Sequence, residues 1–511
     1  MRTFLTSMKL YAVMLVATVF LFSSCSKGAD DLMEVVPKDA NVVFTAKPEK
    51  LLTSSDLQNV LLKADVLSKG DREYFKSFSS LFASESGIDY SNLVGFVYDQ
   101  KLYMVFVVKD EDDLAKNEFI RDNTTKGEDK GIVYFEFDDN SGTLFLKDGL
   151  GWFVAMSKDP DDAIRDIERL AELDSEKKLV SDDLFTGNMP EEDLNVYMNL
   201  EGLVDEFASR QMILEQMDRE LRHTGMTAKD LNIDKLLKGR VFLSMLDEKE
   251  TLSITGKILD EKGEPIQFTD GTIDTDILKY IEPNASFVAA SKVNEAVKEV
   301  WLAQLEKELG GGYGEAQALL TELKKVIRSF EGTIALGFTL PEPVIVEVEK
   351  EDYWGDTYTS RDFNYPKMGA TVVAKFKENP KKLLELAKQM GLPTKPDGTV
   401  LIPVDDSFTM QIIVDGNYMI VSSRNLPSKG FSDPGFFGGS NAAMVVNASK
   451  GSKLAKLAKD YAGVDLDMTA VMYSNEKEGK LSVKVNNNDY EGVLAYFFHT
   501  IISLSQKAEA M

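Results

Sequence analysis

Short apolar runs bounded by Asp, Asn and Gly recur along most of the chain, and this pattern predicts β-strands. The runs are rich in Val, Ile, Phe and Tyr, as in residues 103–109 (YMVFVVK) and 144–157 (LFLKDGLGWFVAMS). Asp138-Asp139-Asn140 and Asp148-Gly149 carry residue types that favour tight turns between successive strands. The pattern therefore predicts hairpins and antiparallel pairing.

Apolar residues at helical spacing interrupt these strands. Residues 159–171 open with Asp-Pro, a helix-cap residue followed by proline at the first helical position, and continue with one apolar face. Residues 379–391 open with Asn-Pro and end on a glycine. Because helices and hairpins are mixed without regular βαβ alternation, we expect an α+β fold whose antiparallel sheets are covered by helices on one face.

The order of these blocks is repeated in the second half of the chain. Residues 36–46 (VPKDANVVFTA) resemble residues 282–290 (EPNASFVAA), and both lead from a proline into an apolar strand. The blocks that match in the same order are 103–109 with 371–377, 134–140 with 401–407, 144–157 with 410–423, 195–200 with 443–448, and 252–258 with 481–487. We therefore predict two related α+β repeats, residues 36–270 and 271–511.

The two predicted repeats differ at two places, where a function could have been added. Residues 201–236 form a long charged helical insertion in the first repeat. Residues 341–368 (PEPVIVEVEKEDYWGDTYTSRDFNYPKM) are inserted in the second, where the first has only a short connection near Tyr98 to Lys101. The alternation in residues 344–349 predicts that this second insertion is a long hairpin.

The N-terminus has the three parts of a secretory signal, namely positive residues, a short apolar core and small residues before a cut. Residues 10–22 are the core, which is shorter than the ~20 residues of a membrane-spanning helix. Phe22-Ser23-Ser24-Cys25 is similar to a lipobox. We expect cleavage after residue 24, a lipid on Cys25 that anchors the protein to the membrane, and a tether over residues 25–35. An ordinary signal with an incidental cysteine is the alternative.

Charge and cysteine content limit the partners and the source of stability. The formal net charge is −26, so the surface repels phosphate backbones and anionic lipids, which argues against nucleic-acid binding. Cys25 is the only cysteine, so the chain can form no internal disulfide. With 43% hydrophobic residues the chain is globular. Its stability must therefore come from packing.

The N-terminal signal, the strand V-P-K-D-A-N-V-V and the following Leu51-Leu52 and Ser55-Asp56-Leu57 resemble lipoproteins of the domain-of-unknown-function family 4836, found in Bacteroides-type bacteria. The resemblance covers most of the mature chain, but its motifs are strand and turn patterns. It implies a location in a Gram-negative envelope, at the periplasmic or the surface-exposed face of the outer membrane. It supplies no activity, ligand or catalytic residue.

Candidate catalytic and metal-binding residues are few. His223 lies in a polar stretch and His499 in an aromatic helix, without HExxH or other metal spacing, so we predict no metal site and no cofactor. Residues 230–234 begin like a calcium loop but lack its glycine and distal glutamate. Asp138-Asp139 recurs as Asp405-Asp406, which a shared turn explains better than an acid/base pair. We therefore predict no catalytic residue.

The predicted hairpin insertion is the one candidate binding site. Its aromatic residues alternate with acidic ones, and flat rings beside carboxylates suit sugar rings or protein partners. These candidate ligand-binding residues are Tyr353, Trp354, Tyr358, Phe363 and Tyr365. Cross-strand pairing of the rings is the structural alternative. We expect a non-catalytic envelope protein that binds a glycan or an envelope protein; a carboxylate-dependent envelope hydrolase acting on carbohydrate is the other hypothesis.

Overall fold

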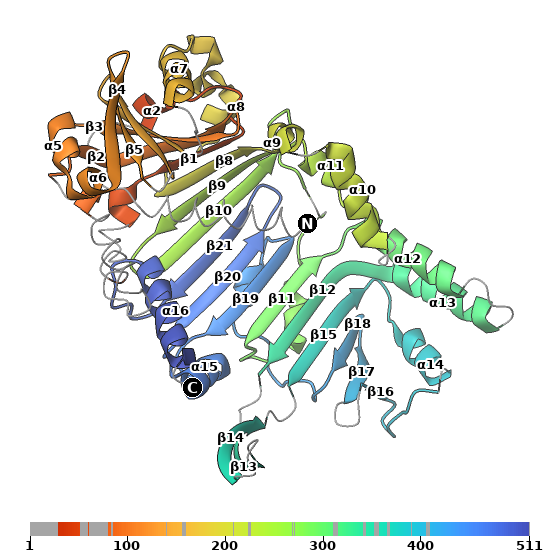
Figure 1. Cartoon of the computed structure of the whole chain (residues 1–511). Helices are drawn as coiled ribbons and strands as arrows, with labels where there is room; N and C mark the ends of the chain where they lie inside the picture. Colours follow the sequence, from red (N-terminus) through yellow and green to blue (C-terminus); the bar gives the residue numbers. More distant parts are fainter. Residues whose placement is uncertain are drawn as a thin grey trace. The chain divides into compact units, whose positions relative to one another are not determined.

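The computed structural model describes residues 29–51, 60, 80–82, 85–138, 141–155, 160–207, 209–222, 226–267, 269, 271–309, 315–340, 344–351, 357–364, 368–389, 391–404 and 409–509 (Figure 1). The chain divides into two compact units. Unit 1 comprises Met1–Met212, Lys235–Ile266 and Asn487–Met511, and unit 2 comprises Ile213–Asp234 and Gln267–Asn486. Unit 1 is therefore built from three separate stretches of sequence.

Unit 1 contains one antiparallel sheet. Its strands are β1 (Val42–Ala46), β2 (Ile88–Tyr98), β3 (Lys101–Val108), β4 (Thr124–Asp129), β5 (Ile132–Phe137), β6 (Gly142–Lys147), β7 (Leu150–Ala155), β8 (Leu194–Asn199), β9 (Arg240–Asp247) and β10 (Thr251–Leu259). Their pairings give the order β4-β5-β6-β7-β3-β2-β1-β8-β9-β10. β2 carries a bulge between Asp89 and Val94.

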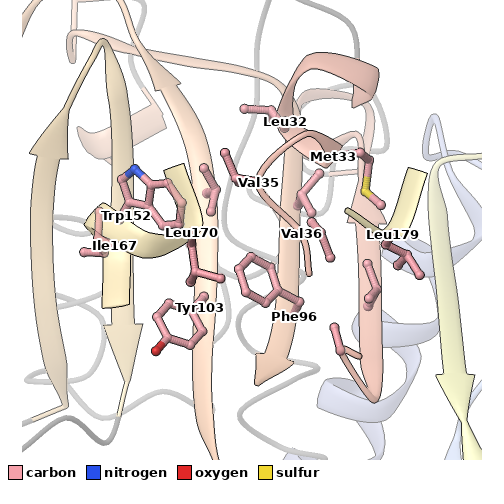
Figure 2. Packing of buried hydrophobic residues seen from close by; sticks show 14 of the residues in the cluster. Leu32, Met33, Val35, Val36, Phe96, Tyr103, Trp152, Ile167, Leu170 and Leu179 are labelled. Atoms are coloured by element: carbon pink, nitrogen blue, oxygen red, sulfur yellow. The ribbon is translucent and has the colours of Figure 1, made fainter. Parts of the chain in front are cut away.

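Both faces of this sheet are buried. On one face, Phe96, Tyr103 and Trp152 pack under α2 (Ala29–Met33), α7 (Pro160–Ala171), η4 (Leu179–Ser181) and α8 (Asp183–Thr186) (Figure 2). On the other face, Phe44 and Met104 pack with residues of η2 (Ser80–Phe82), α5 (Glu111–Lys116), α6 (Glu118–Asn123) and α16 (Val493–Glu509). The short η3 (Ser175–Lys177) precedes η4.

Local sequence explains several of these elements. Asp148 and Gly149 both have positive φ, 55° and 76°, and join β6 to β7 as a two-residue hairpin turn. α7 begins at Pro160, and its Ile164 and Ile167 are fully buried. Asp110 caps α5 by accepting the N–H groups of Asp112 and Asp113.

Unit 2 also contains one antiparallel sheet. Its strands are β11 (Phe287–Lys292), β12 (Phe330–Thr339), β15 (Gly369–Phe376), β16 (Val400–Pro403), β17 (Thr409–Asp415), β18 (Tyr418–Ser422), β19 (Ala442–Ala448), β20 (Met468–Ser474) and β21 (Gly479–Val485). Their order is β16-β17-β18-β15-β12-β11-β19-β20-β21. β12 carries a bulge between Phe330 and Ile334.

One face of the unit 2 sheet is covered by the 3₁₀ segments η6 (Thr275–Tyr280) and η7 (Pro434–Phe437), which pack on Val288, Val373 and Val445. The other face carries a smaller cluster of Phe330 and Phe376 with residues of α13 and α14. The helices of this part of the chain are α12 (Glu295–Leu309), α13 (Glu315–Ser329), α14 (Lys381–Gln389) and α15 (Lys453–Ala462), and between β8 and β9 the chain forms α9 (Leu200–Phe207), α10 (Arg210–Leu221) and α11 (Ile233–Leu236).

The predicted α+β class, with antiparallel sheets and helices, is confirmed. The expectation that helices cover one face of each sheet is wrong for unit 1. Its strands are apolar at consecutive positions, as in β3, where Leu102 through Phe106 are all buried. A strand of that kind has to be covered on both faces.

Candidate functional site

The predicted ligand-binding residues lie on a separate hairpin. β13 (Val344–Glu351) and β14 (Thr357–Asn364) pair with each other as a two-stranded antiparallel sheet. Tyr358 pairs with Lys350 and Phe363 pairs with Ile345. Tyr353, Trp354 and Tyr365 lie outside the described residues, as do the side chains of Tyr358 and Phe363. For the candidate site, the structure therefore describes the backbone of the two strands and none of the five candidate side chains.

Only some of the other residues singled out from sequence lie in the described part of the chain. Asp138 follows β5 in a turn, whereas Asp139, Asp405, Asp406, His223 and Cys25 lie outside the described residues. His499 is exposed on α16, with its ring 5.5 Å from that of Tyr490. Within the described ranges, no group of three or more His, Cys, Asp or Glu side chains could hold a metal ion.

A group of interacting polar side chains in unit 2 lies where η6 meets β12, β15, β17 and β18, and we call it the Lys375 cluster. Its members are Asp274, Lys279, Tyr280, Glu331, Lys375, Asp415 and Tyr418. Lys375 pairs with Asp274, and its Nζ lies 3.2 Å from Glu331 Oε2. The Tyr280 hydroxyl donates to Asp415 Oδ2 at 2.8 Å. Lys279 Nζ lies 4.9 Å and 4.7 Å from the ring centroids of Tyr280 and Tyr418.

The electrostatics of the Lys375 cluster indicate a structural network. Burial raises the pKa of the Tyr280 phenol, and its bond to Asp415 raises it further. The bond to Asp274 raises the pKa of Lys375. Burial alone would raise the pKa of Asp274, but its bonds to Lys375 and to the Asp276 N–H lower it. Tyr280 and Lys375 thus keep their protons at neutral pH, and neither can act as a general base.

A second network lies in unit 1, on the face covered by α7. Asp166 accepts bonds from Lys101 Nζ at 2.6 Å, from the Tyr103 hydroxyl at 3.0 Å and from Arg169 Nη2 at 3.0 Å. The Arg169 guanidinium lies 5.4 Å from the ring centroid of Tyr98. Burial raises the pKa of Tyr103, and the Asp166 charge adds to the shift. A carboxylate that already receives three donors stabilises α7 against the sheet and offers little to a substrate.

Two buried carboxylates lie near the start of α16. Asp247, at the end of β9, is 6% exposed, and Asp193, just before β8, is 2% exposed. Asp247 Oδ1 accepts the N–H groups of Val493 at 2.8 Å and Leu494 at 3.3 Å. Asp193 Oδ2 accepts the Asp247 N–H at 3.0 Å, and Asp193 Oδ1 pairs with Lys50 at 2.9 Å. Asp247 Oδ2 has no hydrogen-bond partner among the described residues.

This arrangement does not provide the pair of carboxylates that a glycoside hydrolase needs. Such enzymes place two carboxyl groups ~5–10 Å apart on either side of the scissile bond, open to the substrate. Asp193 and Asp247 are both buried. Asp193 Oδ2 and Asp247 Oδ1 accept backbone N–H groups, and Asp193 Oδ1 pairs with Lys50. Among the described carboxylates, no observation favours the hydrolase hypothesis.

Sequence reasoning missed all three networks. Asp247 and Val493 are 246 positions apart, and Tyr280 and Asp415 are 135 apart. Asp247 sits in the run LSMLDEKE, which looks like an ordinary strand end followed by a turn. A single buried carboxylate leaves no local pattern in sequence, because the partners that define it come from distant elements.

Comparison with known proteins gives no family for this chain. No family model matches the sequence, and no curated protein matches it. Among solved structures, crystal form I of TP0453 is 12% identical over 48% of this chain and 82% of that chain, with a TM-score of 0.26. Crystal form IV of TP0453 is 10% identical over 44% and 79%, with a TM-score of 0.27.

A further solved structure is a putative DNA polymerase III beta subunit from Eubacterium rectale. It is 11% identical over 88% of this chain and 100% of that chain, with a TM-score of 0.09. Likenesses this weak carry no argument about function. No helix in the described part of the chain has the length and hydropathy needed to cross a membrane.

Proposed function

We propose that this chain is a lipid-anchored protein of the bacterial cell envelope, held through Cys25, that binds a ligand or partner without catalysis. The observation that carries the proposal is the N-terminal segment, in which a positive start and a short apolar core end at Phe22-Ser23-Ser24-Cys25. The polar networks of the body support the non-catalytic part, because Asp166 and Lys375 are engaged in structural bonds.

We also propose that the body arose from two copies of one α+β repeat. The strand orders support this, because β5-β6-β7-β3-β2-β1-β8-β9-β10 of unit 1 corresponds strand by strand to β16-β17-β18-β15-β12-β11-β19-β20-β21 of unit 2. The bulges support it as well, since both fall in the second strand of their unit. Register agrees too: Val42 pairs with Val97 in unit 1, and Phe287 pairs with Phe338 in unit 2.

This correspondence identifies what was added to the second copy. In unit 1, β2 and β3 are joined by the tight turn Asp99-Gln100, both residues with positive φ. In unit 2, the equivalent strands β12 and β15 are separated by the β13–β14 hairpin. An insertion at a strand connection leaves the core unchanged and is a common place for binding residues. We therefore propose that this hairpin, with Trp354 and its neighbouring rings, binds glycans.

The anchor is tested by replacing Cys25 with alanine and feeding cells a clickable fatty-acid analogue. We expect the Cys25→Ala protein to lose the label and to leave the membrane fraction, because a lipid chain contributes ~0.8 kcal/mol per buried CH₂. Ser26→Ala is the matched control and should be labelled like the wild type. Equal labelling of Cys25→Ala and wild type would show that the lipoprotein assignment is wrong.

The glycan site is tested on an array of envelope and host glycans. We expect Trp354→Ala to weaken binding by about 2- to 12-fold, since one aromatic stacking contact contributes ~0.5–1.5 kcal/mol. Trp301→Ala is the control, because Trp301 is an exposed tryptophan (39%) on α12, outside the hairpin. Unchanged binding by Trp354→Ala, or an equal loss in the control, would reject the hairpin as the binding site.

A further inference from the structure

The last helix of the chain starts on a buried carboxylate. The first N–H groups of α16, from Val493 and Leu494, donate to Asp247 Oδ1, which therefore caps the helix from a distant strand. Val493 and Ala495 are fully buried, and Leu494 packs against the cluster that contains Phe44 and Met104. One carboxyl group, together with apolar packing, thus holds the start of α16 against the rest of unit 1.

Neighbouring contacts hold the segment just before α16. Asn488 Nδ2 donates to the carbonyl oxygens of Lys249 at 2.6 Å and Gly492 at 3.1 Å. Lys249 Nζ lies 3.0 Å from Glu491 Oε1, and both side chains are more than half exposed. The charged groups that act on Asp247 inside the site are Asp193, which disfavours its ionisation, and Lys50, which favours it. Glu248 follows in the chain and points to solvent.

Of the two oxygens of the Asp247 carboxyl group, one accepts hydrogen bonds from described residues and the other does not. Oδ1 has two donors, but Oδ2 is buried and accepts no hydrogen bond from any residue that the structure describes. A buried ionised carboxylate is costly unless donors or cations compensate both oxygens. Lys50, a cation that favours the ionised form of Asp247, is already paired with Asp193. A proton on Asp247 removes the uncompensated charge and leaves Oδ1 free to accept the helix N–H groups.

We propose that α16 is a proton-dependent latch. It docks on the rest of unit 1 more tightly when Asp247 is protonated than when it is ionised. Burial raises the pKa of Asp247 to about 6 in the docked state, although the N–H groups of Leu494 and Val493 lower it. Once α16 undocks and water reaches the carboxyl group, the ordinary value of about 3.9 applies.

The sign of the pH effect follows from these two values. Below the ordinary aspartate pKa the group is protonated in both states, and the latch is at its tightest. Between about 3.9 and about 6 the undocked state is ionised while the docked state still holds its proton, so docking weakens as pH rises. Above about 6 both states are ionised, and docking no longer changes with pH. A difference of about two pH units between the two states corresponds to a change of about 100-fold in the docking equilibrium.

Amide hydrogen exchange on the full chain tests the latch. Rates are measured between pH 5 and pH 8 and divided by the intrinsic exchange rates, with α7 as the internal reference. We expect the protection of the first turns of α16 to fall about tenfold over this range relative to α7, because the rest of the 100-fold change lies below pH 5. In Asp247→Asn, which keeps an oxygen acceptor and cannot ionise, protection should be flat and above the wild-type value throughout this range.

The matched control is Asp110→Asn, because Asp110 also caps a helix but is exposed. It should keep the wild-type fall in protection of α16. The proposal is overturned if wild-type protection of α16 does not change with pH, or if Asp247→Asn shows the same fall. Should Asp247→Asn fail to fold, the NMR chemical shift of the Asp247 carboxyl carbon is followed against pH in the wild type. A titration midpoint near pH 6 supports the latch, and a midpoint near pH 4 overturns it.

Discussion

Replacing Trp152 with alanine is expected to lower the free energy of unfolding of unit 1 by about 3–5 kcal/mol, the usual cost of removing a large buried ring. Trp152 is fully buried on β7, where it pairs with Val105 of β3 and Phe145 of β6, in the cluster that includes Ile167 and Leu170 of α7 (Figure 2). Equilibrium urea unfolding followed by circular dichroism measures the loss.

Trp152→Phe is the informative control. The indole Nε1 is buried without a hydrogen-bond partner, so phenylalanine keeps most of the ring and removes an unsatisfied donor. We therefore expect a cost well below that of alanine, on the order of 1 kcal/mol. A loss below 1 kcal/mol in Trp152→Ala would contradict the buried position of this side chain.

Gly87→Ala is expected to destabilise unit 1 by about 2–5 kcal/mol. Gly87 has φ of +77°, where a side chain costs ~1–2 kcal/mol, and overpacking adds ~1–3 kcal/mol. A Cβ atom there would lie 2.2 Å from Asp110 O and 2.6 Å from Leu114 N, both backbone atoms of the start of α5. The helix would have to move, which also disturbs the bonds from the Lys109 and Asp110 N–H groups to Gly87 O.

Gly131→Ala separates the backbone cost of a side chain at positive φ from the cost of overpacking. Gly131 has nearly the same φ, +78°, but an added Cβ would meet nothing within 4 Å. We expect only the backbone cost of ~1–2 kcal/mol there. Thermal unfolding of both variants gives the difference, and equal destabilisation by the two would argue against close packing of Gly87 on α5.

Local sequence predicted the parts of the fold that neighbouring residues determine. Asp148-Gly149 identified a tight turn because few residue pairs adopt positive φ at both positions. The apolar spacing after Pro160 identified α7, whose buried face matches the spacing. Strand and turn patterns also suggested the repeated order of blocks, which stays a prediction.

Contacts between distant residues could not be predicted in this way. The buried pair formed by Asp247 and the start of α16 depends on the return of residues 487–511 to unit 1. The Asp166 network depends on α7 packing across β3. Continuous apolar runs such as residues 103–106 did carry a signal, since they indicate burial on both faces, but hairpin signals alone suggested a sheet covered on one face only.

The three-part composition of unit 1 has a consequence for the order of folding. The ribosome synthesises α16, which completes unit 1, after all of unit 2. The contact of Leu494 with the Phe44 cluster spans most of the chain, and that of Val493 with Asp247 spans 246 positions. Contacts of such high sequence separation form late and slowly. During synthesis, unit 1 is therefore an incomplete intermediate. Part of one face of its sheet stays uncovered until α16 has been made.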